Sequence, residues 1–94
     1  MIRVILESPA GELAVVGHFG NEVFLCQSSE THFPLLSQVD NVSYAVFSRA
    51  DMPELLSELK ALPTEAVKCI NEVIGLARRC HEEPETMLTF TPFT

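Results

Sequence analysis

Residues 46–63 of the chain, VFSRADMPELLSELKALP, contain the local signals that decide the fold. An apolar run at residues 42–47 has the composition of a strand, and Asp51 then stands as an N-cap with Glu54 three positions later. A proline occupies the first turn after Asp51, and apolar side chains recur at helical spacing at Met52, Leu55, Leu56, Leu59 and Leu62. The stretch therefore predicts a strand that leads directly into an amphipathic helix over residues 52–61.

The segments before this stretch predict further antiparallel strands. Ile2, Val4 and Leu6 alternate with Arg3, Ile5 and Glu7, and the turn residues 8–11 follow, which is typical of a first strand. Residues 13–16 and 23–26 flank a Gly-Asn pair, which predicts a tight hairpin between a second and a third strand. The polar connector 28–41 follows, and residues 33–36 within it predict a single helical turn.

A second helix is predicted behind Pro63, with Thr64 as N-cap and an end before Pro84. Its apolar side chains cover about half of the helical wheel, so the helix needs more than one neighbour; they are Ala66, Val67, Cys69, Ile70, Val73, Ile74, Leu76, Ala77, Cys80 and His81. Residues 87–93 predict a last strand. The chain of 94 residues is thus expected to be one α+β domain, residues 1–94, with a small, mainly antiparallel sheet of four or five strands and two helices packed on one face.

Composition limits the classes of partner and the compartment. Thirteen acidic and six basic side chains give a net charge of −7, which disfavours nucleic acid and favours a basic protein partner. No apolar run approaches the roughly 20 residues that cross a bilayer, so a cytoplasmic protein without a membrane segment is expected. Three cysteines, an odd number, favour reduced and packed thiols over a disulfide framework.

An acidic ridge on the first helix is the predicted partner-binding site. Asp51, Glu54 and Glu58 are spaced three and four residues apart, so on a helix they fall within about 60° of one another. Like charges at this spacing repel, and a cationic partner gains by neutralising them. The alternative is a solvated helix face, and on either interpretation replacing Glu58 by Gln is expected to affect stability little.

From residue 33 to residue 90, about two-thirds of the chain, the sequence resembles a group of small acidic bacterial proteins of uncharacterised function. Those proteins are similar to toxin-immunity proteins in size, acidity and variability. The resemblance rests on FPLL at residues 33–36, Asp40, Val46, Phe47, Arg49, Met52, the leucine-rich first helix and LARRC at residues 76–80. The resemblance implies an α+β protein that neutralises a basic partner and brings no catalytic motif. The chain departs from the group at residues 41–44, where a cluster of Pro, Gly and Asp is usual.

No motif for catalysis, metal binding or cofactor binding is present in the sequence, since it lacks C-x-x-C, H-E-x-x-H and G-x-S-x-G. The function predicted is therefore that of a non-enzymatic protein-interaction module. One alternative is a small-ligand or enzymatic domain with a pocket near His32, Tyr44 and His81, and another is a structural homo-oligomer. A homodimer is expected, because the wide apolar arc of the second helix and the edge strands invite a partner.

Overall fold

The computed structural model describes residues 2–40, 42–63 and 67–92, and the side chains of residues 67–69 lie outside this description. Its elements, in chain order, are β1 (Ile2–Ser8), β2 (Gly11–Gly17), α1 (Glu22–Leu25), the 3₁₀ turn η1 (Leu36–Gln38), β3 (Ala45–Ser48), the 3₁₀ turn η2 (Arg49–Asp51), α2 (Met52–Lys60), α3 (Val67–Glu82) and β4 (Met87–Pro92). This arrangement confirms the predicted α+β class.

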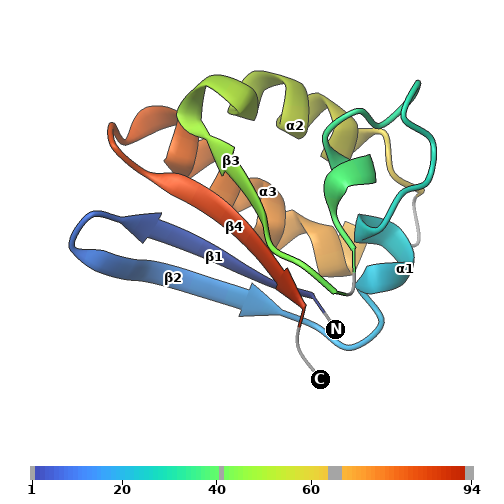
Figure 1. Cartoon of the computed structure of the whole chain (residues 1–94), viewed down its shortest axis with the longest axis horizontal. Helices are drawn as coiled ribbons and strands as arrows, with labels where there is room; N and C mark the ends of the chain where they lie inside the picture. Colours follow the sequence, from blue (N-terminus) through green and yellow to red (C-terminus); the bar gives the residue numbers. More distant parts are fainter. Residues whose placement is uncertain (1, 41, 64–66, 93–94) are drawn as a thin grey trace.

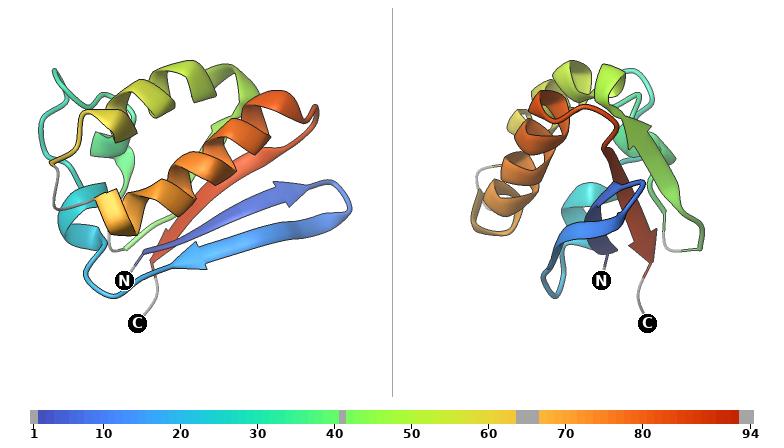
Figure 2. Two further views of the ribbon diagram at one scale, coloured as in Figure 1. Left: turned by 180° about the vertical axis from the view of Figure 1, so that it is seen from behind. Right: turned by 90° about the vertical axis from the view of Figure 1, so that its left-hand side faces the viewer.

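The four strands form one sheet in the order β2-β1-β4-β3, and every neighbouring pair is antiparallel. Helices α2 and α3 lie on one face of the sheet (Figures 1 and 2). In Figure 1 the sheet lies in front of α2 and α3, so the viewer sees its opposite face. No helix of the described residues covers that face. The predicted architecture of two helices on one face is therefore confirmed.

Alternation along the strands places one side of the sheet in the core. Ile2, Val4 and Leu6 of β1 are fully buried, and Phe47 of β3 meets Phe90 of β4 edge to face, with ring centroids 5.5 Å apart. The two helices supply the opposite wall of this core with Met52, Leu55 and Leu59 from α2 and Ile70, Val73, Leu76, Ala77 and Cys80 from α3. The apolar arc of α3 contacts both α2 and the sheet, as its width requires.

The predicted third strand at residues 23–26 is wrong, because the chain forms the helical turn α1 there. The preceding residue, Asn21, is fully buried, and its side chain makes two 2.7 Å hydrogen bonds with the backbone N–H and carbonyl of Ile2. Asn21 thus binds the start of β1 instead of forming a hairpin turn. Leu25 of α1 enters the core, whereas Val23 is exposed.

The strand predicted at residues 42–47 begins later than expected, as β3, Ala45–Ser48. The reason is Asp40, whose carboxylate accepts 2.8 Å hydrogen bonds from the backbone N–H groups of Val42 and Ser43. Those two groups are held in a local turn and are not available for sheet pairing. The helical turn expected at residues 33–36 is present slightly later, as η1.

Both predicted helices are present with small changes at their ends. α2 ends one residue earlier than expected. α3 ends at Glu82, before the proline, as predicted. Thr64, the expected N-cap of α3, lies outside the described residues. The hydroxyl of Thr86 closes the end of α3 by donating to the carbonyls of Cys80 and Glu83. Within the described ranges, no helix has the length and the apolar composition that a membrane span requires.

Candidate interaction surface

The predicted acidic ridge does not form as a surface feature, because Glu58 points inward. Glu58 is only 5% exposed. Its side-chain Oε1 accepts hydrogen bonds from the backbone N–H groups of Leu35 at 3.0 Å and Leu36 at 2.9 Å. Its Oε2 lies 3.2 Å from the nitrogen of Leu35. Glu58 therefore holds the connector against α2, and its carboxylate is not presented to a partner.

Asp51 also differs from the prediction, since its side chain does not cap α2. The turn η2 precedes α2, so the helical path starts earlier, with Ser48 at the N-cap and Asp51 third after it. The Asp51 carboxylate accepts from the backbone N–H of Ser48 at 3.0 Å and from its hydroxyl at 3.2 Å, the reciprocal half of a capping box. Of the three ridge residues only Glu54 is exposed, and partner binding by the three stays a prediction.

The three residues of the alternative pocket lie in different parts of the fold. His32 belongs to the connector, where its Nδ1 lies 3.0 Å from the Ser29 hydroxyl. Tyr44 precedes β3 and is exposed, while His81 lies near the end of α3, where its backbone carbonyl accepts a 2.7 Å hydrogen bond from Arg49 Nε. The geometry therefore gives these side chains no common site.

The thiols with described side chains are packed and poorly reactive. Cys80 is fully buried and Cys26 is half-buried, and burial raises the pKa of both thiols. A raised pKa leaves little thiolate, which is the nucleophilic form and the metal-binding form. The described residues also contain no group of three or more His, Cys, Asp or Glu side chains placed to hold a metal ion.

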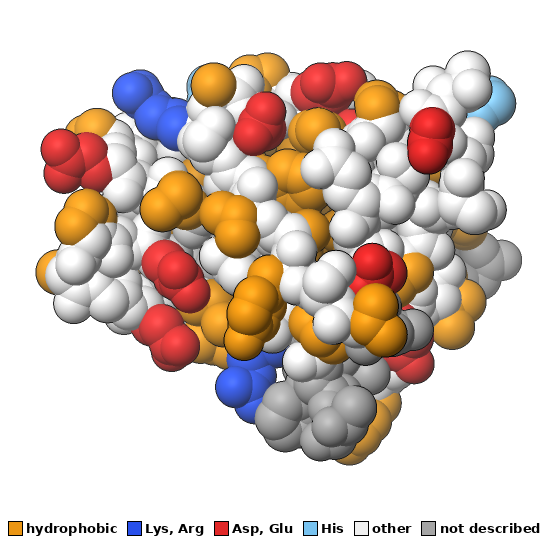
Figure 3. Space-filling view, in the orientation of Figure 1, with side chains coloured by type: hydrophobic (Ala, Val, Ile, Leu, Met, Phe, Trp, Pro, Cys, Tyr) orange, Lys and Arg blue, Asp and Glu red, His pale blue; other side chains and the backbone are white. Residues whose placement is uncertain are grey.

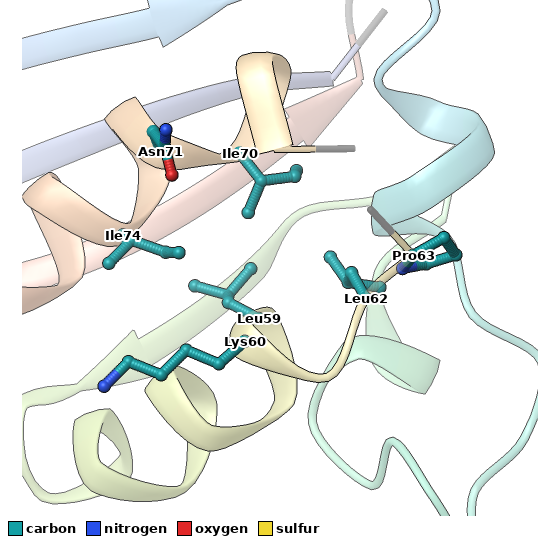
Figure 4. Close-up of a pocket in the computed structure, with 7 residues that line it drawn as sticks. All are labelled: Leu59, Lys60, Leu62, Pro63, Ile70, Asn71 and Ile74. Carbon is teal, nitrogen blue, oxygen red and sulfur yellow. The ribbon is translucent and has the colours of Figure 1, made fainter. Parts of the chain in front are cut away.

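A small cleft lies between α2 and α3 (Figure 4). It holds about 200 Å³ and is lined by Leu59, Lys60, Leu62, Pro63, Ile70, Asn71 and Ile74. Ligand pockets usually hold roughly 300–1,000 Å³ and orient the ligand with a few convergent polar groups. This cleft is smaller, and its apolar side chains point toward one another across the helix pair (Figure 4). It is therefore best explained as a packing seam between the helices.

The uncovered face of the sheet carries an apolar row that crosses all four strands. Ile5 of β1 is the register partner of Val15 in β2 and of Thr89 in β4, and Thr89 is the partner of Val46 in β3. Val15 and Val46 are 46% and 53% exposed, while Ile5 and Thr89 between them are 7% and 8% exposed. These four residues, which we term the central row, form a strip of three apolar side chains and one threonine across the sheet, and Val15 and Val46 are its solvent-exposed ends.

Charged and aromatic side chains border the central row. Arg3 and Tyr44 line one end of a shallow hollow of about 460 Å³ on this face, and Glu7 and Glu12 line the other end. Figure 3 looks onto the face: orange side chains gather over the strands, with red side chains toward the left and blue side chains below. We call the central row and these four bordering residues the open face.

The acidic end of the open face is electrostatically unfavourable in the isolated chain. Glu7 and Glu12 are register partners on adjacent antiparallel strands. Like charges directly opposite each other in a sheet destabilise it. A positive group placed against the two carboxylates relieves this repulsion, so this end of the open face favours a cation.

Sequence reasoning missed the open face as a site, although it identified part of the pattern. The alternation of Arg3, Ile5 and Glu7 along the first strand was visible in the sequence, but their meeting with Val15 and Val46 depends on the strand order. Comparisons of the chain with protein-family models, with curated proteins and with solved structures found no match in any of the three.

Proposed function

We propose that the protein is a protein-interaction module and that the open face is its contact surface. The observation that carries this proposal is the central row, with Val15 and Val46 about half exposed on the side of the sheet away from the helices. In an antiparallel sheet with one face packed on a core, the solvated face is normally polar. A contiguous apolar strip with a polar border is typical of interaction sites.

The bordering residues support the same proposal. Tyr44 is 74% exposed beside the central row, and Arg3 lies at the same end of the hollow. Tyrosine and arginine are enriched at protein interfaces, because each combines a large contact area with hydrogen-bonding groups. An enzymatic function has less support, since no described His or Cys lines the hollow beside Glu7 and Glu12, and the described residues contain no cluster placed to hold a metal ion.

Neutralisation of a basic protein, the immunity-type role, remains a narrower form of this proposal. The net charge of −7 steers a cationic protein toward the surface. The exposed Glu54 and the Glu7–Glu12 pair are among the acidic groups that such a partner could contact, and they lie on different layers of the fold. The open face and α2 are therefore separable in an experiment.

Site-specific photo-crosslinking in the native host tests the proposal. A photoreactive residue at Val46 is expected to give a covalent adduct with a protein, and a second substitution, Val15→Asp, is expected to remove that adduct. The matched control is the same photoreactive residue at Glu54, on the helical layer. No adduct from position 46, or equal adducts from both positions, would contradict use of the open face, and adducts from position 54 alone would favour the acidic helix.

A further inference from the structure

Opposite charges lie at equal distances on either side of the centre of the open face. Arg3 precedes Ile5 by two residues and Glu7 follows it by two, so all three side chains project from the same side of β1. At a rise of about 3.4 Å per residue, each charged residue is displaced by roughly 7 Å along the strand from Ile5. The open face therefore carries a basic side chain at one end, apolar side chains in the middle and acidic side chains at the other end.

We propose that the open face binds the open face of a second copy of this chain, related by a two-fold axis that runs between the sheets and perpendicular to the strands. This inference rests on the proposed function and names its partner. Such an axis reverses the strand direction, so the central row of one copy covers that of the other. Arg3 of each copy then faces the Glu7–Glu12 pair of the other copy.

Self-complementarity is what distinguishes a second copy from another protein. An isologous contact uses the same patch on both subunits, so every charge must find its opposite when the patch is rotated onto itself. The perpendicular axis meets this condition at both ends of the open face. An axis parallel to the strands brings like-charged ends together, and a purely basic partner satisfies the Glu7–Glu12 pair but repels Arg3.

The dimensions of the sheet suit a weak dimer. Sheets pack about 10 Å apart, a distance that side chains from two inner faces fill. Four strands spaced about 4.8 Å apart, and the span from Arg3 to Glu7, give a footprint of roughly 20 by 15 Å. That footprint is about 300 Å² a side, well below the roughly 800 Å² a side of a standard specific interface, so the contact can only be weak or transient. Association is therefore expected to depend on protein concentration, and on salt through the charged ends.

Charge reversal and mixing test the proposal by sedimentation equilibrium. The wild-type chain is expected to shift from monomer to dimer as its concentration rises. Arg3→Glu and Glu7→Arg are each expected to weaken self-association at least tenfold, because each variant places like charges against each other. An equimolar mixture of the two variants is expected to restore a heterodimer. In that heterodimer the carboxylate introduced at position 3 of one chain faces the guanidinium introduced at position 7 of the other, and the native Arg3 and Glu7 form the matching contact at the opposite end.

The mixture separates a contact between chains from a contact within one chain, because mixing cannot repair a broken internal interaction. Glu54→Arg, on the other layer of the fold, is the control and is expected to leave association unchanged. Far-UV circular dichroism and melting of each variant establish that it is folded. A monomer at every attainable concentration, dimers of the single variants with wild-type affinity, or a mixture that stays monomeric would overturn the proposal. A monomer that still gives a Val46-dependent adduct with a different protein would overturn the second copy but retain the proposed function.

Discussion

Replacing Glu58 tests the clearest difference between the sequence pattern and the structure. The pattern placed Glu58 on a solvated ridge, where its replacement affects stability little. The structure places its carboxylate against the backbone N–H groups of Leu35 and Leu36, which belong to the turn packed beside α2. We therefore expect Glu58→Ala to be strongly destabilising and Glu58→Gln to be moderately destabilising.

The expected magnitudes follow from the hydrogen bonds. A buried N–H group that loses its acceptor costs about 1–3 kcal/mol. Leu36 is fully buried, so its N–H is left without an acceptor in Glu58→Ala. Leu35 is partly exposed, so its N–H can form a hydrogen bond with water instead. Glu58→Ala should therefore lower the free energy of unfolding by about 3 kcal/mol. In Glu58→Gln the amide oxygen can replace Oε1, which accepts from both groups, so the losses are the charge and the weaker contact of Oε2 with the Leu35 nitrogen. Because charged hydrogen bonds are roughly twice as strong as neutral ones, the loss of the charge costs about 1 kcal/mol.

Urea denaturation followed by far-UV circular dichroism provides the measurement, because the chain has no tryptophan to report by fluorescence. Glu54→Ala is the matched control, since Glu54 lies one turn earlier on α2 and is exposed, and it should change stability by about 0.5 kcal/mol or less. Hydrogen exchange at the amides of Leu35 and Leu36 should accelerate in Glu58→Ala. A loss no larger than that of the Glu54 control, or equal losses for Ala and Gln, would refute this account.

Three further predictions concern single residues. Asn21→Ala should lower the free energy of unfolding by about 2–4 kcal/mol, because two buried backbone groups of Ile2 lose their partners; a change below about 1 kcal/mol in urea titration would contradict this. Gly75→Ala should raise stability by about 0.5–1 kcal/mol in thermal melts, since the added methyl group meets no atom within 4 Å on the exposed side of α3, and a lower melting temperature would disagree. Backbone hydrogen bonds lower the pKa of Asp40, so its stabilisation of the loop is present above the ordinary pKa of an aspartate and is lost as pH falls through the lowered folded value. Amide chemical shifts of residues 42–43 should report that loss, and they should show no such titration in Asp40→Asn.

Much of the fold was predictable from local patterns. The alternation of Ile2, Val4 and Leu6 predicted β1, and the apolar spacing behind Asp51 predicted α2 nearly to its last residue. These signals are reliable because strand and helix periods act within a few residues. The α+β class followed from the number and type of such segments.

The errors at residues 23–26 and at Glu58 occurred where distant contacts outweigh the local pattern. Residues 23–26 had the short apolar composition that suits a strand or a helix equally, and the bond from Asn21 to the start of β1 selected the helical turn. The error at the N-cap of α2 had a local cause, because the turn η2 precedes α2 and gives the N-cap position to Ser48 and not to Asp51.

The sequence by itself determined the periodicity of the elements, the acidic surface and the lack of a catalytic motif, because all three are properties of neighbouring residues or of composition. Only the tertiary structure decided the use of each side chain. Glu58 is buried because a turn 22 positions earlier along the chain packs on its helix. Ile5, Val15 and Val46 form one surface because the strand order joins β2, β1, β4 and β3 and the helices cover the other face. Both outcomes depend on pairings between segments far apart in sequence, and no local period encodes those pairings.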